Sequence, residues 1–325
     1  MPASAFCQAL VVNLDSNNAL TLVKGSVPVT KPDKHQLLIK VSHVAQNPTD
    51  VQSLDSNAFG DGAILGCDFI GIVEETGSDI TRITKGTTIA GLIWGGLSGE
   101  QACAIPLASY TALLSLFSKD CLAINTSGYE KPTVLIWGGS SSVGLYAVQI
   151  AKLHGLEVFT TCSPKYHDLL KSCGVKGVFD YRDPQVVDKI REAVPDLRYV
   201  FDTIGNNSSS KTASSAITHS SGVLCTVRPG KANTDDIAKN VKVTDVLVWT
   251  AFLQDHRYRD FHWPPSQEDH DLAAKFFREL PDLLSSGKIK PNTTKLIESG
   301  LDGVEQGFQE YRDGKISNYK IVYKI

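Results

Sequence analysis

The stretch from Thr133 to Gly144, which reads TVLIWGGSSSVG, constrains the fold more than any other part of the chain. A short apolar run ends at two glycines, and small residues lead from there to a third glycine. Apolar residues then recur at helical spacing as far as His154, and Gly155 follows where a helix favours a left-handed terminal residue. The pattern predicts a strand, a tight turn and a helix, whose N-terminal N–H groups suit a dinucleotide pyrophosphate.

The segment after this helix indicates which dinucleotide the turn would bind. Residues 157–161 form a second predicted buried strand, and the chain continues as Cys162, Ser163, Pro164 and Lys165. A site selective for NAD usually ends this strand with an acid that accepts from the ribose 2′-hydroxyl. Hydroxyls followed by a lysine instead suit a 2′-phosphate, so we predict NADP(H) as the cofactor. The same residues also fit a plain helix start, and the two interpretations are compatible.

Composition narrows the class of protein. The chain has 325 residues, a formal net charge of −3 and 42% hydrophobic residues, which is ordinary for a globular enzyme. It contains no basic run typical of nucleic-acid binding and no apolar stretch long enough to span a bilayer. The first 14 residues lack the pattern of a signal peptide, and the seven cysteines never form a C-x-x-C pair. We therefore expect a cytoplasmic protein with reduced thiols and no nucleic-acid or membrane partner.

The order of predicted elements indicates two domains. Residues 1–105 are β-rich, with short strands between turn signals, and strands alternate with helices from residue 133 to about 250. This alternation predicts an α/β fold with a parallel, doubly wound sheet. Residues 272–284 have the pattern of an amphipathic helix, and residues 315–325 form a terminal strand that we expect to return to the first domain. The histidine- and proline-rich segment 256–270 is predicted to be a loop.

Four motifs follow one another in an order that resembles the medium-chain dehydrogenase/reductase superfamily. NPTD at 47–50 and GCDFIG at 66–71 precede the glycine turn, and GKISNYKIV at 314–322 ends the chain. Segments 134–144, 161–164 and 179–184 resemble, more narrowly, the fungal trans-acting enoyl reductases of polyketide biosynthesis, the lovastatin-type and ToxD-like group. The resemblance covers nearly the whole chain. It implies a GroES-like catalytic domain (1–105), a Rossmann NADP-binding domain (106–270) and a return to the catalytic domain (271–325).

The resemblance also implies the site residues. NADP(H) contacts are expected at Asn47, Pro48, Thr49, Asp50, Ser141, Ser142, Val143, Gly144, Ser163, Pro164, Lys165, Tyr166, Tyr181, Ile316 and Ser317. Substrate contacts are expected at Pro106, Leu107, Ala108, Ser109, Tyr110, Thr111, Ala112 and Leu113. Three of the cofactor residues have a structural alternative: Tyr181 as a strand cap, Asp50 as a helix cap and Ser317 as a turn residue.

The chain departs from the superfamily pattern in two places. Zinc-dependent members need a cysteine within the segment that here reads Asn47 to Asp50, and Gly-His-Glu where this chain has Gly66, Cys67 and Asp68. We therefore predict no catalytic zinc, with Cys67 as a small buried hydrophobe. The chain is also short between Gly96 and Leu97, where family members carry additional strands beside the expected acyl pocket.

The implied reaction is reduction of an α,β-unsaturated polyketide thioester by hydride transfer from NADPH to the β-carbon. Tyr110 and Thr111 are the candidates for stabilising the charge that develops on the thioester oxygen, and both also fit packing positions on the helix. A quinone oxidoreductase needs the same cofactor and fold. A non-catalytic NADP(H)-binding protein that docks on a synthase is the third possibility, and the short segment at Gly96 and Leu97 favours it.

The expected partner is the acyl carrier protein of a highly reducing polyketide synthase, with this chain as a monomer. Carrier domains are acidic around their prosthetic arm, so a basic docking face is expected. Arg257 and Arg259 form the best local cluster, although a solvated loop explains them equally simply.

Overall fold

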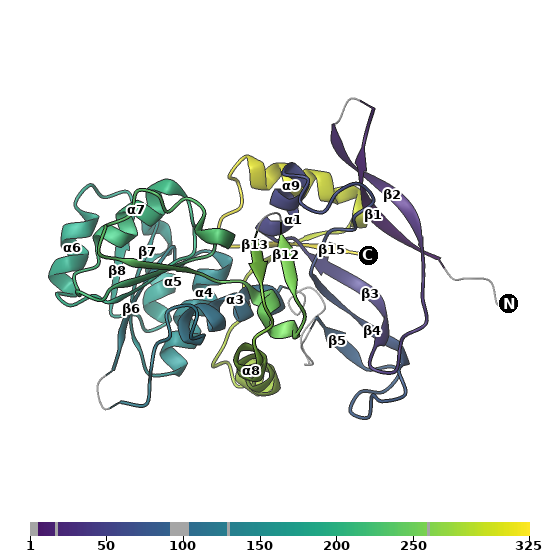
Figure 1. The fold of residues 1–325 in the computed structure, drawn as a ribbon, viewed down its shortest axis with the longest axis horizontal. Coiled ribbons are helices and arrows are strands. Elements are labelled where there is room, and N and C mark those ends of the chain that lie inside the picture. The colour runs from purple at the N-terminus through teal and green to yellow at the C-terminus, as the bar shows by residue number, and fades with distance from the viewer. Residues whose placement is uncertain (1–5, 17–18, 92–103, 129–130, 259–260) are drawn as a thin grey trace. The chain divides into compact units, whose positions relative to one another are not determined.

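The computed structural model describes residues 6–16, 19–91, 104–128, 131–258 and 261–325 (Figure 1). Two compact units are present. The first comprises Met1–Leu107 and Pro291–Ile325, and the second comprises Ala108–Lys290. Segment 92–103 includes Gly96 and Leu97, so the predicted deletion lies outside the described residues, as does Arg259.

The first unit is built on β-structure. A hairpin pairs β1 (Phe6–Leu14) with β2 (Leu20–Pro28). A five-stranded sheet has the order β14 (Thr294–Ile297), β15 (Lys320–Lys324), β3 (Leu37–Ala45), β4 (Asp68–Thr76) and β5 (Thr88–Ala90). The C-terminal strand β15 pairs antiparallel with β3 and parallel with β14, so the end of the chain completes the sheet begun near its start. Among its described residues, the helices of this unit are α1 (Pro48–Asp55) and α9 (Val304–Arg312), with a 3₁₀ turn at Gly300–Gly303.

The second unit contains a six-stranded parallel sheet. Its order is β11 (Lys242–Asp245), β10 (Val223–Thr226), β9 (Tyr199–Asp202), β6 (Thr133–Trp137), β7 (Glu157–Cys162) and β8 (Gly177–Asp180). The first strand in sequence lies at the centre and the chain winds outward to both edges, which is the doubly wound arrangement. The helices are α3 (Pro106–Phe117), α4 (Ser142–Leu153), α5 (His167–Ser172), α6 (Val186–Ala193), α7 (Asn207–Ser215) and α8 (Gln267–Ser285). The predicted fold class, a β-rich domain plus a domain with a doubly wound parallel sheet, is confirmed.

The structure places the return to the first unit at Pro291, twenty residues beyond the boundary expected from the sequence. The reason is helix α8, whose buried side chains belong to the second unit. The ring of Phe277 lies 5.5 Å from that of Tyr110, and Thr250 Oγ1 donates to Asp269 Oδ2 at 2.7 Å. Of the segment 271–325 that was expected to return, only Pro291–Ile325 is therefore part of the first unit.

The segment predicted as a loop at 256–270 contains a short antiparallel hairpin, so that prediction was wrong. Strand β12 (His256–Tyr258) pairs with β13 (Phe261–Trp263), and α8 already begins at Gln267. Aromatic packing explains the difference, since the His256 ring lies 5.5 Å from Trp249 and 6.3 Å from Trp263. Among the described residues, no helix is both long and apolar enough to cross a membrane.

Candidate cofactor and active site

The turn between β6 and α4 packs so closely that two of its glycines cannot carry a side chain. Gly138 has φ of +86°, in the region that disfavours other residues. A Cβ on Gly144 would lie 2.2 Å from the carbonyl oxygen of Gly138. The glycines therefore bring the start of α4 against the end of β6 and leave the first helical N–H groups at the sheet edge.

Ser141 and Thr203 hold this turn together. The Ser141 hydroxyl accepts from the N–H of Gly144 at 2.9 Å and shares a 2.8 Å hydrogen bond with the Thr203 hydroxyl. Thr203 follows β9, the neighbour of β6, and its hydroxyl also lies 2.9 Å from the carbonyl oxygen of Trp137. Ser141 thus caps α4, and its hydroxyl stabilises the turn itself. The sequence analysis missed Thr203, although a hydroxyl directly after a parallel strand was a usable signal.

The next two strands present the other predicted cofactor residues at the same edge. Because β6, β7 and β8 are parallel neighbours, the segments after them lie together. Ser163 precedes the 3₁₀ turn Pro164–Tyr166, where its side chain makes no capping hydrogen bond. Lys165 is exposed, with Nζ 4.7 Å from the centre of the Tyr166 ring, and Tyr181 is 46% exposed after β8. This edge therefore carries a helix start, a hydroxyl and a cation, and Cys162 ends β7 in place of an acid.

Arg182 adds a second cation beside these residues. Its Nε and Nη2 donate to the two carboxylate oxygens of Asp180 at 3.1 and 3.2 Å, which lowers the pKa of that carboxyl. The guanidinium lies 5.5 Å from the centre of the Tyr181 ring. The sequence analysis did not assign Arg182 to the site, although it adjoins Tyr181.

In the first unit, the predicted residues Asn47 and Asp50 belong to a buried polar cluster with Cys67, Asp68 and Lys320. Asn47 precedes α1, and its Nδ2 donates to Asp68 Oδ2 at 3.0 Å. Lys320 Nζ donates to the same oxygen at 2.6 Å. The other oxygen, Asp68 Oδ1, accepts from the backbone N–H of Leu107 at 3.0 Å. Each oxygen of Asp68 is therefore engaged.

Asp50 and Cys67 are the other two acidic side chains of this cluster, and they contact each other. The Asp50 Oδ2 atom accepts from the N–H of Asn47 at 2.7 Å, so Asp50 helps to cap α1, one of the alternatives left open by the sequence. Burial raises the pKa of Asp50 to about 7, and the thiol of Cys67 lies 3.8 Å from Asp50 Oδ1. Burial also raises the pKa of the Cys67 thiol.

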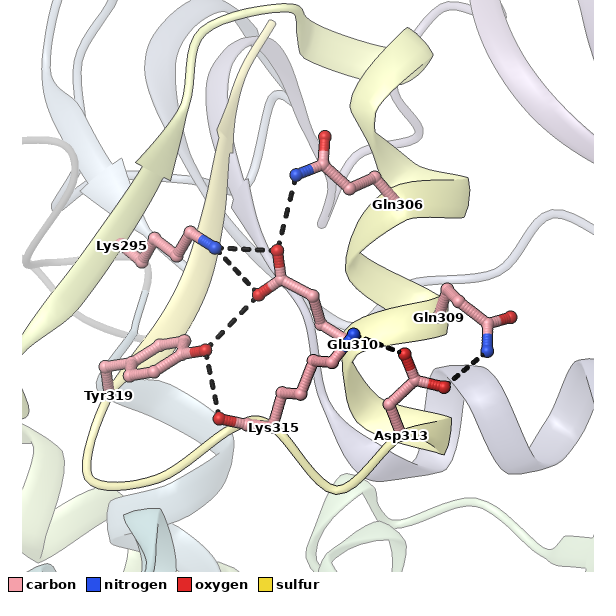
Figure 2. A pocket seen from close by; sticks show the side chains of 7 residues that line it. All are labelled: Lys295, Gln306, Gln309, Glu310, Asp313, Lys315 and Tyr319. Carbon is pink, nitrogen blue, oxygen red and sulfur yellow. Dashed lines mark hydrogen bonds and ion pairs between the residues drawn. The ribbon is translucent and has the colours of Figure 1, made fainter.

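Lys315 and Tyr319 line a cavity of about 500 Å³ on the first unit, and the predicted residues Ile316 and Ser317 lie between them in sequence (Figure 2). Glu310 of α9 is central to it, since its carboxylate accepts from Lys295 Nζ at 2.6 and 2.8 Å and from the Tyr319 hydroxyl at 3.2 Å. These bonds tie the segment before β15 to α9. Ile316 packs partly buried against the core of the unit, and Ser317 is exposed.

The predicted substrate segment forms the first two turns of α3, where most of its side chains are buried. Tyr110 is 2% exposed, and its hydroxyl donates to the carbonyl oxygen of Asp269 at 3.4 Å. Burial also raises the pKa of its hydroxyl. This placement supports the packing alternative for Tyr110 and does not support a catalytic role. Leu107 and Thr111 are partly exposed, and Thr111 stays a prediction.

Both halves of the chain match known protein families. Residues 33–136 match the alcohol dehydrogenase GroES-like domain, and residues 142–259 match the zinc-binding dehydrogenase family. Together with the fold, these matches define a medium-chain dehydrogenase/reductase. Solved structures agree on the fold: the quinone oxidoreductase from Coxiella burnetii has a TM-score of 0.71 at 21% identity and covers 99% of this chain. The CurK enoyl reductase has a TM-score of 0.72 at 18% identity, with 98% of each chain covered.

Curated relatives narrow the class. Trans-enoyl reductase ACTTS2 of Alternaria alternata is 32% identical, with 92% of this chain and 94% of the relative covered. The enoyl reductase component lovC of the lovastatin nonaketide synthase, from Aspergillus terreus, is 27% identical over 98% of this chain and 96% of its own length. The chain belongs to the trans-enoyl reductase family of the medium-chain dehydrogenases/reductases.

The buried cluster predicts that the protein holds no stoichiometric zinc. The ammonium of Lys320 already lies against Asp68, and Asn47 is not a usual zinc ligand. Elemental analysis of the purified protein should give far less than one zinc per chain, and chelator treatment should leave NADPH binding unchanged. One tightly held zinc per chain would contradict this prediction.

The pKa of Asp50 predicts a pH dependence of stability. Between pH 4 and 7 the folded protein holds a proton on Asp50 that the unfolded chain has released, so rising pH destabilises the fold. The loss is at most ~1.4 kcal/mol per pH unit and levels off above pH 7. Urea unfolding from pH 5 to pH 8 should show wild type losing stability relative to Asp50→Asn. A constant difference between the two proteins would contradict the raised pKa.

Proposed function

We propose that this chain is an NADPH-dependent trans-acting enoyl reductase that reduces an α,β-unsaturated polyketide thioester. The observation that carries the proposal is the sheet edge of the second unit. It combines a helix start at the glycine turn with Ser163 and Lys165, and with no acid at the end of β7. The relatives named as trans-enoyl reductases support the reaction, because they match over nearly their whole length.

The chain's own residues have distinct parts in this proposal. The N–H groups at the start of α4 bind the pyrophosphate, and Lys165 pairs with the 2′-phosphate. Asn47, Asp50 and Ser317 of the first unit are the further expected contacts of the cofactor. When bound, NADPH supplies the hydride for the β-carbon of the enoyl group, and the protein supplies position and electrostatic stabilisation. Thr111 is the remaining candidate for contact with the thioester oxygen.

A non-catalytic NADP(H)-binding protein is the second candidate. The match to the lovastatin component runs over 354 residues, more than the 325 of this chain, so that relative has residues without a counterpart here. If strands are missing between Gly96 and Leu97, the acyl pocket loses a wall and water reaches the reacting atoms. Inserting the relatives' segment there should then restore turnover.

One set of measurements separates the candidates. NADPH binding is titrated by fluorescence, and NADPH oxidation is followed with an enoyl thioester and with a quinone. We expect binding and turnover of the thioester. Binding without turnover of either substrate selects the non-catalytic protein, and turnover of the quinone alone selects a quinone oxidoreductase.

Lys165 should determine the preference for NADPH. Lys165→Ala removes one charge-assisted contact to the 2′-phosphate, worth roughly 1.5–3 kcal/mol, and should weaken NADPH about 10- to 100-fold while NADH binding barely changes. Isothermal titration with both cofactors measures the two losses. The control is Lys171→Ala, which removes an exposed lysine of α5 that pairs with Asp168. Equal losses for NADPH and NADH would refute the assigned contact.

The partner in this proposal is an acyl carrier protein, and Arg257 and Arg259 are its docking residues. Arg257 is exposed on β12. Arg257→Glu with Arg259→Glu should slow reduction of the carrier-bound substrate in a salt-dependent way and spare a small soluble thioester. The control, Lys275→Glu with Arg278→Glu, makes the same charge change on the exposed side of α8. Equal slowing of both substrates would exclude a docking role.

A further inference from the structure

Lys320 carries a charge into the interior of the first unit. Its side chain is 4% exposed, and that of its partner Asp68 is 1% exposed. The two residues are 252 positions apart in sequence and meet because β15 and β4 both flank β3. Burying two charges is costly, and the pair alone is weak grounds for stability. The ion pair is therefore better explained by the neighbouring groups that it holds in place.

We propose that Lys320 is a positioning residue, whose ammonium fixes the Asp68 carboxylate so that it holds the Asn47 side chain and the Leu107 N–H. The proposal rests on the proposed function, because Asn47 belongs to the expected cofactor contacts and Leu107 to the expected substrate segment. Lys320 itself touches neither cofactor nor substrate in this account.

The geometry of Asp68 supports the role. One carboxylate oxygen accepts from both Lys320 and Asn47, and the other accepts from Leu107. Three donors that approach from β15, from the start of α1 and from the start of α3 leave the carboxylate a single orientation. Without the ammonium, Asp68 would be an unpaired buried charge or would take up a proton, and a protonated oxygen no longer accepts two hydrogen bonds equally.

The same geometry predicts that a neutral pair of side chains at positions 68 and 320 cannot hold both Asn47 and Leu107. In the double variant Asp68→Asn with Lys320→Met, neither charge remains, so the penalty of an unpaired buried charge is absent. Asn47 and Leu107 donate to different oxygens of Asp68, however, and the amide at position 68 replaces one of these oxygens with an NH2 donor. The double variant should therefore stay folded while at least one of the two held groups is released.

The experiment uses the full chain and compares wild type, the double variant and Lys320→Met alone. The control is Lys24→Met, which removes the half-exposed lysine paired with Asp302 in the same unit. We expect the double variant to unfold near the wild-type denaturant midpoint, whereas Lys320→Met alone unfolds at a clearly lower one. We also expect the double variant to bind NADPH about tenfold more weakly or to raise KM for the thioester about tenfold, with kcat little changed. Amide hydrogen exchange should be faster at Leu107 or in the first turn of α1.

Wild-type behaviour in the double variant, in NADPH affinity, KM and amide exchange alike, would overturn the proposal. If the double variant does not fold, the variant Asn47→Ala provides the test. It leaves the ion pair intact and removes only the amide that Asp68 holds. Wild-type NADPH affinity in Asn47→Ala would then overturn it as well. If wild type itself does not bind NADPH, the proposed function and this inference are both overturned. If wild type binds NADPH and the variants bind it with the same affinity, only the inference is overturned.

Discussion

The contact of Gly144 with the carbonyl oxygen of Gly138 is the constraint on which the second unit depends. It requires two positions without side chains, and it places the start of α4 at the edge where β6, β7 and β9 end. The hydroxyls of Ser141 and Thr203 then satisfy the polar groups of the turn. In the proposed function, the N–H groups and the dipole at the start of α4 then face the pyrophosphate of the cofactor.

The first unit depends instead on a cluster of polar side chains that are buried near the ends of its strands. Asp68 receives an ammonium, an amide and a backbone N–H, and Asp50 holds the start of α1. Removing a single member leaves the others unpaired in a low-dielectric interior, so the cluster behaves as one network. Burial raises the pKa of Asp50 and of the Cys67 thiol, which favours their neutral forms and so limits the net charge in this interior.

Local patterns predicted the parts of this structure that depend on neighbours in sequence. The glycine turn, the parallel sheet and the buried face of α8 follow from spacing and apolar periodicity. Thr203 and Lys320 were missed, since they act on residues 62 and 252 positions away that only the folded sheets bring close. The hairpin at β12 and β13 was missed because aromatic packing outweighs the polar composition of that segment. For Tyr110 the sequence left packing and catalysis both open, because a position before the nucleotide-binding strands does not indicate which side of α3 is buried.

The fate of the transferred hydrogen tests the central claim most directly. Enoyl thioester is incubated with the protein and with NADPH that carries deuterium on the transferred position of C4, and the product is examined by mass spectrometry and NMR. The account predicts one deuterium at the β-carbon of a saturated thioester. A product without deuterium at that carbon, or an unchanged enoyl thioester beside a protein that binds NADPH, would contradict it.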